Sequence, residues 1–91
     1  MFIGIDHREC LINLLGGDEE KFRSLLDFME SRRFIITEIK PIAKTSNTDR
    51  FVIAGVTKME LKQGGFGYVL VNILVSMNRY KNTFTYNYRI R

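Results

Sequence analysis

The side chains with the most reactive chemistry are His7 and Cys10, which stand three positions apart. On a helix this spacing places two residues on one face. A cysteine beside a histidine can become a thiolate nucleophile, and both side chains bind zinc. A structural zinc site needs four ligands, however, and the chain has one histidine and one cysteine. We therefore predict no metal site, with Cys10 a small core residue and His7 at the surface.

No other group of residues forms a catalytic pattern. Asp18, Glu19 and Glu20 are adjacent, and adjacent residues on a helix point about 100° apart, so they do not converge on one ion. They suit the positive N-terminal end of a helix instead. The glycine-rich segment at residues 64–67 lacks the Lys-Ser/Thr of a phosphate-binding P-loop, and no serine lies in a nucleophile-elbow sequence. We predict that the chain is not an enzyme and binds no cofactor or small-molecule substrate.

Size and composition favour one globular domain. The chain has 91 residues, of which 45% are hydrophobic and 26% charged. A single cysteine allows no internal disulfide, which favours the cytoplasm. The N-terminus lacks the features of a signal peptide. The apolar run at residues 68–77 is shorter than the roughly 20 residues of a membrane-spanning helix, so we expect no membrane insertion.

The first third of the chain predicts two helices. Asp6 and Glu9 form a capping-box pattern for the first helix, and the glycines at 16–17 end it. Asp18 is placed to cap a second helix that ends near residue 33. Its apolar side chains recur at helical spacing: Phe22, Leu25, Leu26 and Met29. Before the first helix, residues 2–5 form a short apolar run that is typical of an edge strand.

After residue 33 the apolar period changes from 3.6 to 2, which predicts strands at residues 34–44, 50–62, 66–77 and 83–91. Short polar loops between them indicate an antiparallel meander. Pro41 favours an edge position or a bulge for the first strand. The predicted fold is therefore α+β: one domain in which a helical layer, residues 1–33, packs on one face of a four-stranded antiparallel sheet, residues 34–91.

Alternation along the strands assigns side chains to two faces. The face predicted to receive the helices carries Ile35, Thr37, Ile39, Phe51, Ile53, Met59, Leu61, Val69, Val71, Ile73, Val75, Met77, Phe84, Tyr86, Tyr88 and Ile90. The other face carries Lys40, Ile42, Lys44, Arg50, Val52, Ala54, Val56, Lys58, Lys62, Phe66, Tyr68, Leu70, Asn72, Leu74, Thr83, Thr85, Asn87, Arg89 and Arg91. Its centre is apolar and its margins are basic. Two helices cannot cover both faces, so this second face either stays open or is covered by residues 2–5 or a loop.

An exposed apolar surface rimmed by polar groups commonly marks an interaction site. We therefore predict a small binding protein, a regulator or inhibitor of a larger machine such as those carried by phages and mobile elements. The partner is an acidic protein or a second copy in a homodimer. The residues predicted to bind it are Val52, Val56, Leu70 and Leu74 in the centre and Lys58, Lys62, Arg89 and Arg91 on the rim.

The charge distribution agrees with an acidic partner. Residues 1–39 carry eight acidic and five basic side chains, whereas residues 40–91 carry nine basic and two acidic. If the two segments are separate layers, the molecule has an acidic helical side and a basic sheet. Such a field steers association with acidic macromolecules, nucleic acid included. Tyr86 and Tyr88 lie among C-terminal basic residues, but alternation sends them to the helix-facing side, where a core-facing aromatic ladder is expected.

A short segment resembles a known nucleic-acid-binding family. Gly65-Phe66-Gly67-Tyr68-Val69 is similar to the centre of the longer ribonucleoprotein signature of RNA-recognition motifs, and residues 1–4 are similar to the start of the shorter one. The resemblance implies that Phe2, Phe66 and Tyr68 stack on bases of single-stranded RNA. The family order β-α-β-β-α-β differs from the order predicted here. Single-stranded nucleic-acid binding therefore stays the alternative function, with Lys58, Lys62, Arg89 and Arg91 as phosphate contacts.

Overall fold

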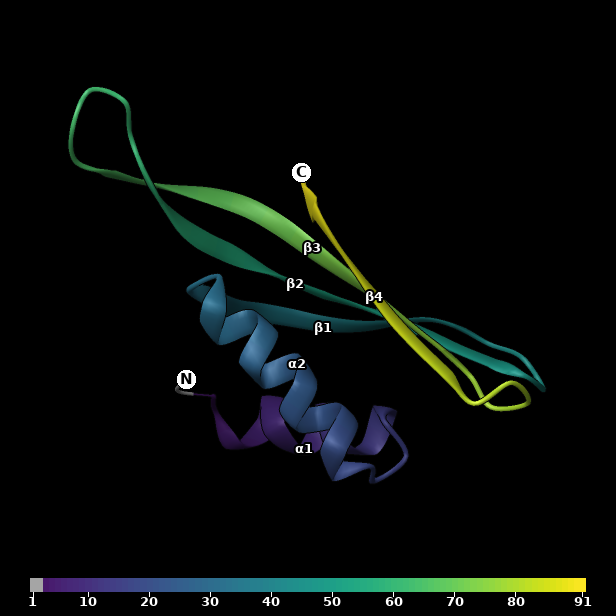
Figure 1. Ribbon diagram of the computed structural model, residues 1–91. Helices are drawn as coiled ribbons and strands as arrows, with labels where there is room; N and C mark the ends of the chain where they lie inside the picture. The colour runs from purple at the N-terminus through teal and green to yellow at the C-terminus, as the bar shows by residue number, and fades with distance from the viewer. Residues whose placement is uncertain (1–2) are drawn as a thin grey trace.

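The computed structural model describes residues 3–91 and has two helices followed by four strands (Figure 1). The elements are α1 (Ile5–Leu14), α2 (Glu19–Ser31), β1 (Phe34–Lys44), β2 (Thr48–Glu60), β3 (Phe66–Asn78) and β4 (Thr83–Ile90). Successive strands pair antiparallel in the order β1-β2-β3-β4. The predicted α+β meander is confirmed, and each strand boundary falls within two residues of its prediction.

The start of α1 differs from its prediction. Gly4 is the N-cap, with no side-chain capping bond, and Asp6 lies inside the first turn. The predicted capping box is therefore wrong. The predicted edge strand at residues 2–5 is wrong for its described part, because Ile3 and Gly4 lie in no strand and Ile5 begins α1; Phe2 lies outside the described residues. Gly16 and Gly17 end the helix as predicted, with φ of +69° and +78°.

Asp18 fixes the start of α2. Its Oδ1 accepts hydrogen bonds from the backbone N–H groups of Glu20 and Lys21, at 3.0 and 3.1 Å. These two donors would have no partner within the helix, so the cap supplies one. The apolar face of α2 buries Phe22, Leu25 and Met29, as the helical spacing predicts.

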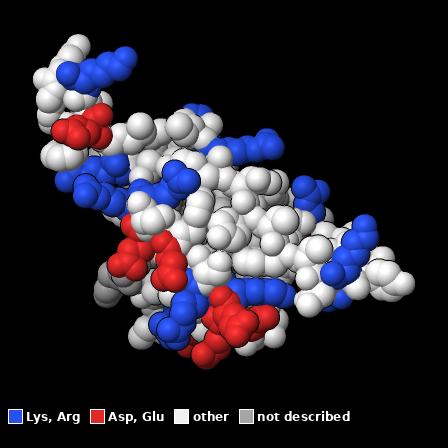
Figure 2. Space-filling view, viewed as in Figure 1, with Lys and Arg blue, Asp and Glu red and all other residues white. Residues whose placement is uncertain are grey.

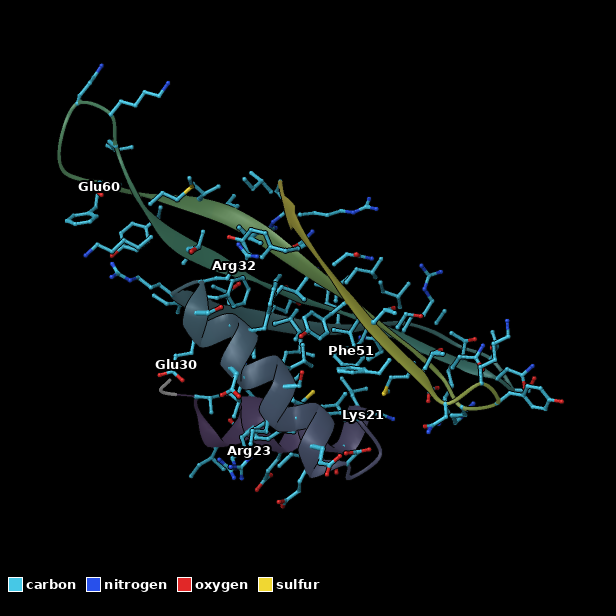
Figure 3. The ribbon with its side chains drawn as sticks, in the orientation of Figure 1. Lys21, Arg23, Glu30, Arg32, Phe51 and Glu60 are labelled. Carbon is cyan, nitrogen blue, oxygen red and sulfur yellow. The ribbon has the colours of Figure 1, made fainter. Side chains whose placement is uncertain are left out.

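The core lies between the helices and one face of the sheet. The helices contribute Leu11, Leu15, Phe22, Leu25 and Met29, and the strands contribute Phe34, Phe51, Ile53, Val71, Ile73, Val75 and Met77. Phe51, which is 1% exposed, lies in the layer between sheet and helices (Figure 3). Every second residue of β2, β3 and β4 packs on the helices. The residues between them point to the other side of the sheet and form a face that the helices do not contact.

Two irregularities change the face assignment of β1. Its register with β2 shifts between Ile36 and Glu38 and again between Pro41 and Ala43. An extra residue in a strand reverses the faces of the residues that follow it. The prediction from Pro41 is confirmed, since β1 is an edge strand and carries a bulge there.

The same bulges change the predicted faces of four β1 residues. Ile35 pairs with Val56, away from the helices, while Ile36 and Ile39 pack against the core. Thr37 lies at the first shift, where its Oγ1 donates to the carbonyl oxygen of Ala54 at 3.1 Å. Lys44 pairs with Asp49 on the helix-facing side, and Ile42 lies at the second shift; both stay exposed and line a pocket with α1 residues.

The middle strands extend beyond their neighbours. β1 begins opposite Thr57 and β4 ends opposite Val71, so residues 58–69 continue as a two-stranded projection, which we name the hairpin arm. Figure 1 shows it leaving the body at the upper left. Its turn uses Gly64 and Gly65, with φ of +88° and +83°, a conformation that glycine adopts without strain. The arm contributes to the elongated shape, 49 × 24 × 18 Å.

Candidate interaction surface

The sheet surface opposite the helices, which we name the open face, is ordered in rows of cross-strand neighbours. The rows are Ile35–Val56–Leu70, Glu38–Ala54–Asn72–Arg89, Lys40–Val52–Leu74–Asn87 and Ala43–Arg50–Ser76–Thr85, and on the arm Lys58–Tyr68 and Glu60–Phe66. The structure thus places Val52 beside Leu74 and Val56 beside Leu70. Opposite residues in antiparallel strands have Cβ atoms about 5 Å apart, so each pair forms one contact surface.

The exposed apolar area of this face lies toward the arm. Leu70 and Ile35 are each 54% exposed, Phe66 is 56% and Tyr68 66% exposed. Together with half-buried Val56 they form a continuous group that we name the apolar strip: Ile35, Val56, Phe66, Tyr68 and Leu70. The prediction placed Ile35 on the helix side because the first shift, between Ile36 and Glu38, has no proline or glycine to mark it.

A polar row divides the strip from the other predicted apolar pair. Glu38, Asn72 and Arg89 lie between Val56–Leu70 and Val52–Leu74. Val52 and Leu74 are half-buried, and Ala54 in the dividing row is 7% exposed. The single apolar centre predicted from alternation is therefore two patches, and the one next to the arm is the more exposed.

The described N-terminal residues do not cover the open face. Ile3 packs against the helix-side core, and Ile5, at the start of α1, is 74% exposed. The predicted alternative in which residues 2–5 fold over this face is therefore wrong for residues 3–5. Phe2 lies outside the described part of the chain.

Basic side chains border the apolar strip. Lys58 and Arg89 are exposed on the open face, and Lys58 Nζ lies 4.1 Å from the centroid of the Phe66 ring. Lys62 lies in the arm turn, and Arg91 follows β4, with its backbone N–H on the carbonyl oxygen of Leu70 at 2.9 Å. All four predicted rim residues therefore lie next to the apolar strip: two on the arm, one in the neighbouring row and one at the end of β4.

Acidic residues on this face are fewer. Glu38 pairs with Lys40 at 3.4 Å, where both side chains are more than half exposed, so the pair contributes little stability. Glu60 lies on the arm (Figure 3). In Figure 2 most of the acidic surface instead lies over the two helices, as the sequence distribution predicts.

The aromatic residues of β4 belong to the helix side. The Tyr86 ring lies 4.8 Å from that of Phe28 on α2, and Arg32 lies over both Phe28 and Tyr88, at 5.0 and 4.9 Å. The predicted core-facing aromatic ladder is confirmed. These rings therefore do not share a surface with Arg89, and of the aromatic residues assigned to nucleic-acid stacking, Phe66 and Tyr68 are the ones described on the open face.

The N-terminal pair His7 and Cys10 lies on α1, away from this surface, and both residues are partly buried. Within residues 3–91, no three or more His, Cys, Asp or Glu residues come together in a group suited to a metal ion. None of the described helices has the length and apolar character needed to cross a membrane.

In comparisons with known proteins, no protein-family model, curated protein or solved structure matches the chain.

Proposed function

We propose that this chain is a binding protein that attaches to an acidic region of another protein through the apolar strip and the basic residues around it. The observation that carries the proposal is the exposure of four large apolar side chains in one continuous group: Ile35, Phe66, Tyr68 and Leu70. Monomeric proteins rarely expose a contiguous apolar patch of several large residues unless it binds something.

The strip supplies affinity and the rim supplies orientation. Fully burying a Leu, Ile or Phe side chain yields about 1.5–3 kcal/mol, and these residues have about half of that area still exposed. Lys58 and Arg89 contribute mainly to the rate of encounter and to the choice of partner. A second copy docked face to face would oppose these cations to one another, so the charges favour an acidic partner on this face.

The projecting arm suits a regulatory role. Tyr68 and Phe66 stand on a ribbon that extends past both flanking strands, so they can enter a groove that the body of the domain cannot. Occupying a groove on a larger protein blocks its use by other ligands, which is how a small inhibitor acts. In this proposal the arm fills the groove, and the basic rim sets the orientation.

A capture experiment with matched variants tests the proposal. Lysate of the organism that encodes the chain is passed over immobilised wild type, Leu70→Asp and Ile42→Asp, with and without nuclease. Leu70 and Ile42 are both 54% exposed, but Ile42 lies at the second register shift of β1, outside the cross-strand rows of the open face. We expect a protein retained by wild type and Ile42→Asp and lost with Leu70→Asp, irrespective of nuclease. Equal retention by all three baits argues against the surface.

The alternative, single-stranded nucleic-acid binding, is favoured by one observation: Phe66 and Tyr68 are exposed side by side next to Lys58. Exposed aromatic residues near cations stack on bases, and such binding weakens steeply with salt. A fluorescent oligonucleotide is titrated at low and at physiological salt. Binding that is lost in Tyr68→Ala and falls with salt supports this function, and no binding at low salt eliminates it.

A further inference from the structure

The two edges of the sheet differ in how they are protected against pairing with another strand. β1 is interrupted by two register shifts and carries Pro41, both of which hinder the addition of a strand. β4 has neither. It pairs with β3 in unbroken register along its whole length, from Thr83 opposite Asn78 to Ile90 opposite Val71. A regular, unprotected edge strand of this length is a template for pairing.

The outward backbone groups of β4 follow from its pairing with β3. The N–H of Arg91 donates to the carbonyl oxygen of Leu70, so this residue pair is hydrogen-bonded. Hydrogen-bonded positions alternate along an antiparallel strand. Arg89, Asn87 and Thr85 therefore also direct their backbone groups at β3. The intervening residues direct theirs outward: Phe84, Tyr86, Tyr88 and Ile90. No backbone bond from another described segment reaches these four residues.

We propose that a second copy of the chain pairs with this edge, β4 against β4 antiparallel, with the two-fold axis at Asn87. This register places Tyr86 opposite the second copy's Tyr88 and Phe84 opposite the second copy's Ile90. It is the register that uses all four outward residues of each strand, and it forms about eight backbone hydrogen bonds. The result is a continuous eight-stranded sheet with both helical layers on one side.

The side chains fit a second copy in this register. On the helix side, Tyr86 and Tyr88 are half-buried in the single chain, and Tyr86 lines an open groove between β4 and α2. Tyrosines directly opposite each other on paired strands stabilise the pairing. On the open face, Arg89 lies opposite Thr85 of the second copy, so no like charges are opposed.

A preformed strand also has an advantage over a disordered peptide as the occupant. Ordering a disordered peptide costs conformational entropy at every residue, which opposes the gain from backbone bonds along one edge. In the second copy this strand is already ordered by β3 and by its contacts with Phe28. The pairing uses the edge and leaves the apolar strip exposed, so it stands independently of the proposed function.

Disulfide trapping tests both the dimer and its register. In a Cys10→Ser background, Asn87→Cys is compared with Thr85→Cys; both positions are exposed, on the same strand and the same face. At the axis, Asn87 faces its own counterpart as a non-hydrogen-bonded pair, with Cα atoms about 4.5 Å apart, which a disulfide spans. In the same register, Thr85 lies opposite Arg89 of the second copy. The Thr85 residues of the two copies are then four positions apart, about 13 Å along the strand, which a disulfide cannot span.

We expect wild type to elute in light scattering at twice 10.7 kDa. We expect Asn87→Cys to form the covalent dimer at least about tenfold faster than Thr85→Cys, because only the former is held beside itself. Asn87→Lys and Asn87→Asp should each be monomeric when alone and associate when mixed. A wild type that stays monomeric at high concentration overturns the proposal. Equal cross-linking of the two cysteine variants, or no association of the charged pair, also overturns it.

Discussion

The ring of Phe34 on β1 lies against the α-carbon of Gly55 on β2. A methyl group added to Gly55 would meet Phe34 Cζ at 2.5 Å and would also overlap the carbonyl oxygen of Ile35. Phe34 is 3% exposed and belongs to the core, so its ring has no free space to move into. The close approach of these two strands at the base of the arm therefore requires a residue without a side chain.

We expect Gly55→Ala to lower the free energy of unfolding by about 3 kcal/mol, because both the ring and a backbone carbonyl would have to move. Gly67→Ala is the matched control in the arm, where the added methyl meets only the flexible end of Leu61, at 3.2 Å. Its effect should stay within about 1 kcal/mol, since alanine also has a lower ordering cost than glycine. Urea denaturation measures both, and equal costs for the two variants would contradict this account of Gly55.

Asp18→Ala should destabilise the protein by about 1 kcal/mol, the usual cost of losing an N-cap. The backbone N–H groups of Glu20 and Lys21 lose their acceptor in this variant. Asp18→Asn keeps an acceptor oxygen in place and should recover most of the loss. If Asp18→Asn is as unstable as Asp18→Ala, the charge near the helix end and the 3.7 Å ion pair with Lys21 matter more than the cap.

Arg79 connects two loops at the end of the sheet distant from the arm. Its Nη1 donates to Asp49 Oδ2 at 3.0 Å, and its Nη2 donates to the carbonyl oxygens of Thr45 and Ser46. Because the Arg79 side chain is 45% exposed, we expect Arg79→Ala to cost only about 1 kcal/mol. Amide hydrogen exchange across residues 45–48 should accelerate.

Lysine cannot reproduce this contact, because a single ammonium group lacks the planar fork that reaches an acid and two carbonyls together. Arg79→Lys should therefore exchange nearly as fast as Arg79→Ala. Lys81→Ala is the control, since its exposed side chain has no hydrogen bond or ion pair among the described residues. Unchanged exchange in Arg79→Ala would show that the loop is held by its backbone alone.

The basic residues on the rim of the open face should raise the rate of association with an acidic partner. Lys58→Glu and Arg89→Glu should slow association with an acidic partner by about tenfold and reduce its salt dependence, with a smaller change in dissociation. Lys81→Glu carries the same charge change on the exposed loop between β3 and β4, at the end of the sheet distant from the arm. Surface plasmon resonance at two salt concentrations measures the rates. Equal slowing by all three variants would point to net charge instead of a local rim.

Local physics in the sequence determined most elements of this fold. Asp18 and the glycines at 16–17 mark helix ends through their own backbone preferences, and the change of apolar period at residue 33 marks the first strand. Asp6 shows the limit of such signals. Its spacing to Glu9 predicts a cap, yet the N-cap lies two residues earlier, at Gly4, because a capping pattern does not fix the residue at which a helix starts.

The tertiary structure alone decided which surface is exposed. The bulges in β1 turn Ile35 outward and Ile42 toward α1, and a bulge depends on the partner strand as much as on its own residues. The arm exists because β1 and β4 stop pairing before β2 and β3 end, which no residue of the arm itself encodes. Alternation fixes which residues share a face within one regular strand. Register and strand length depend on the pairing between strands, and they decide where that face meets solvent.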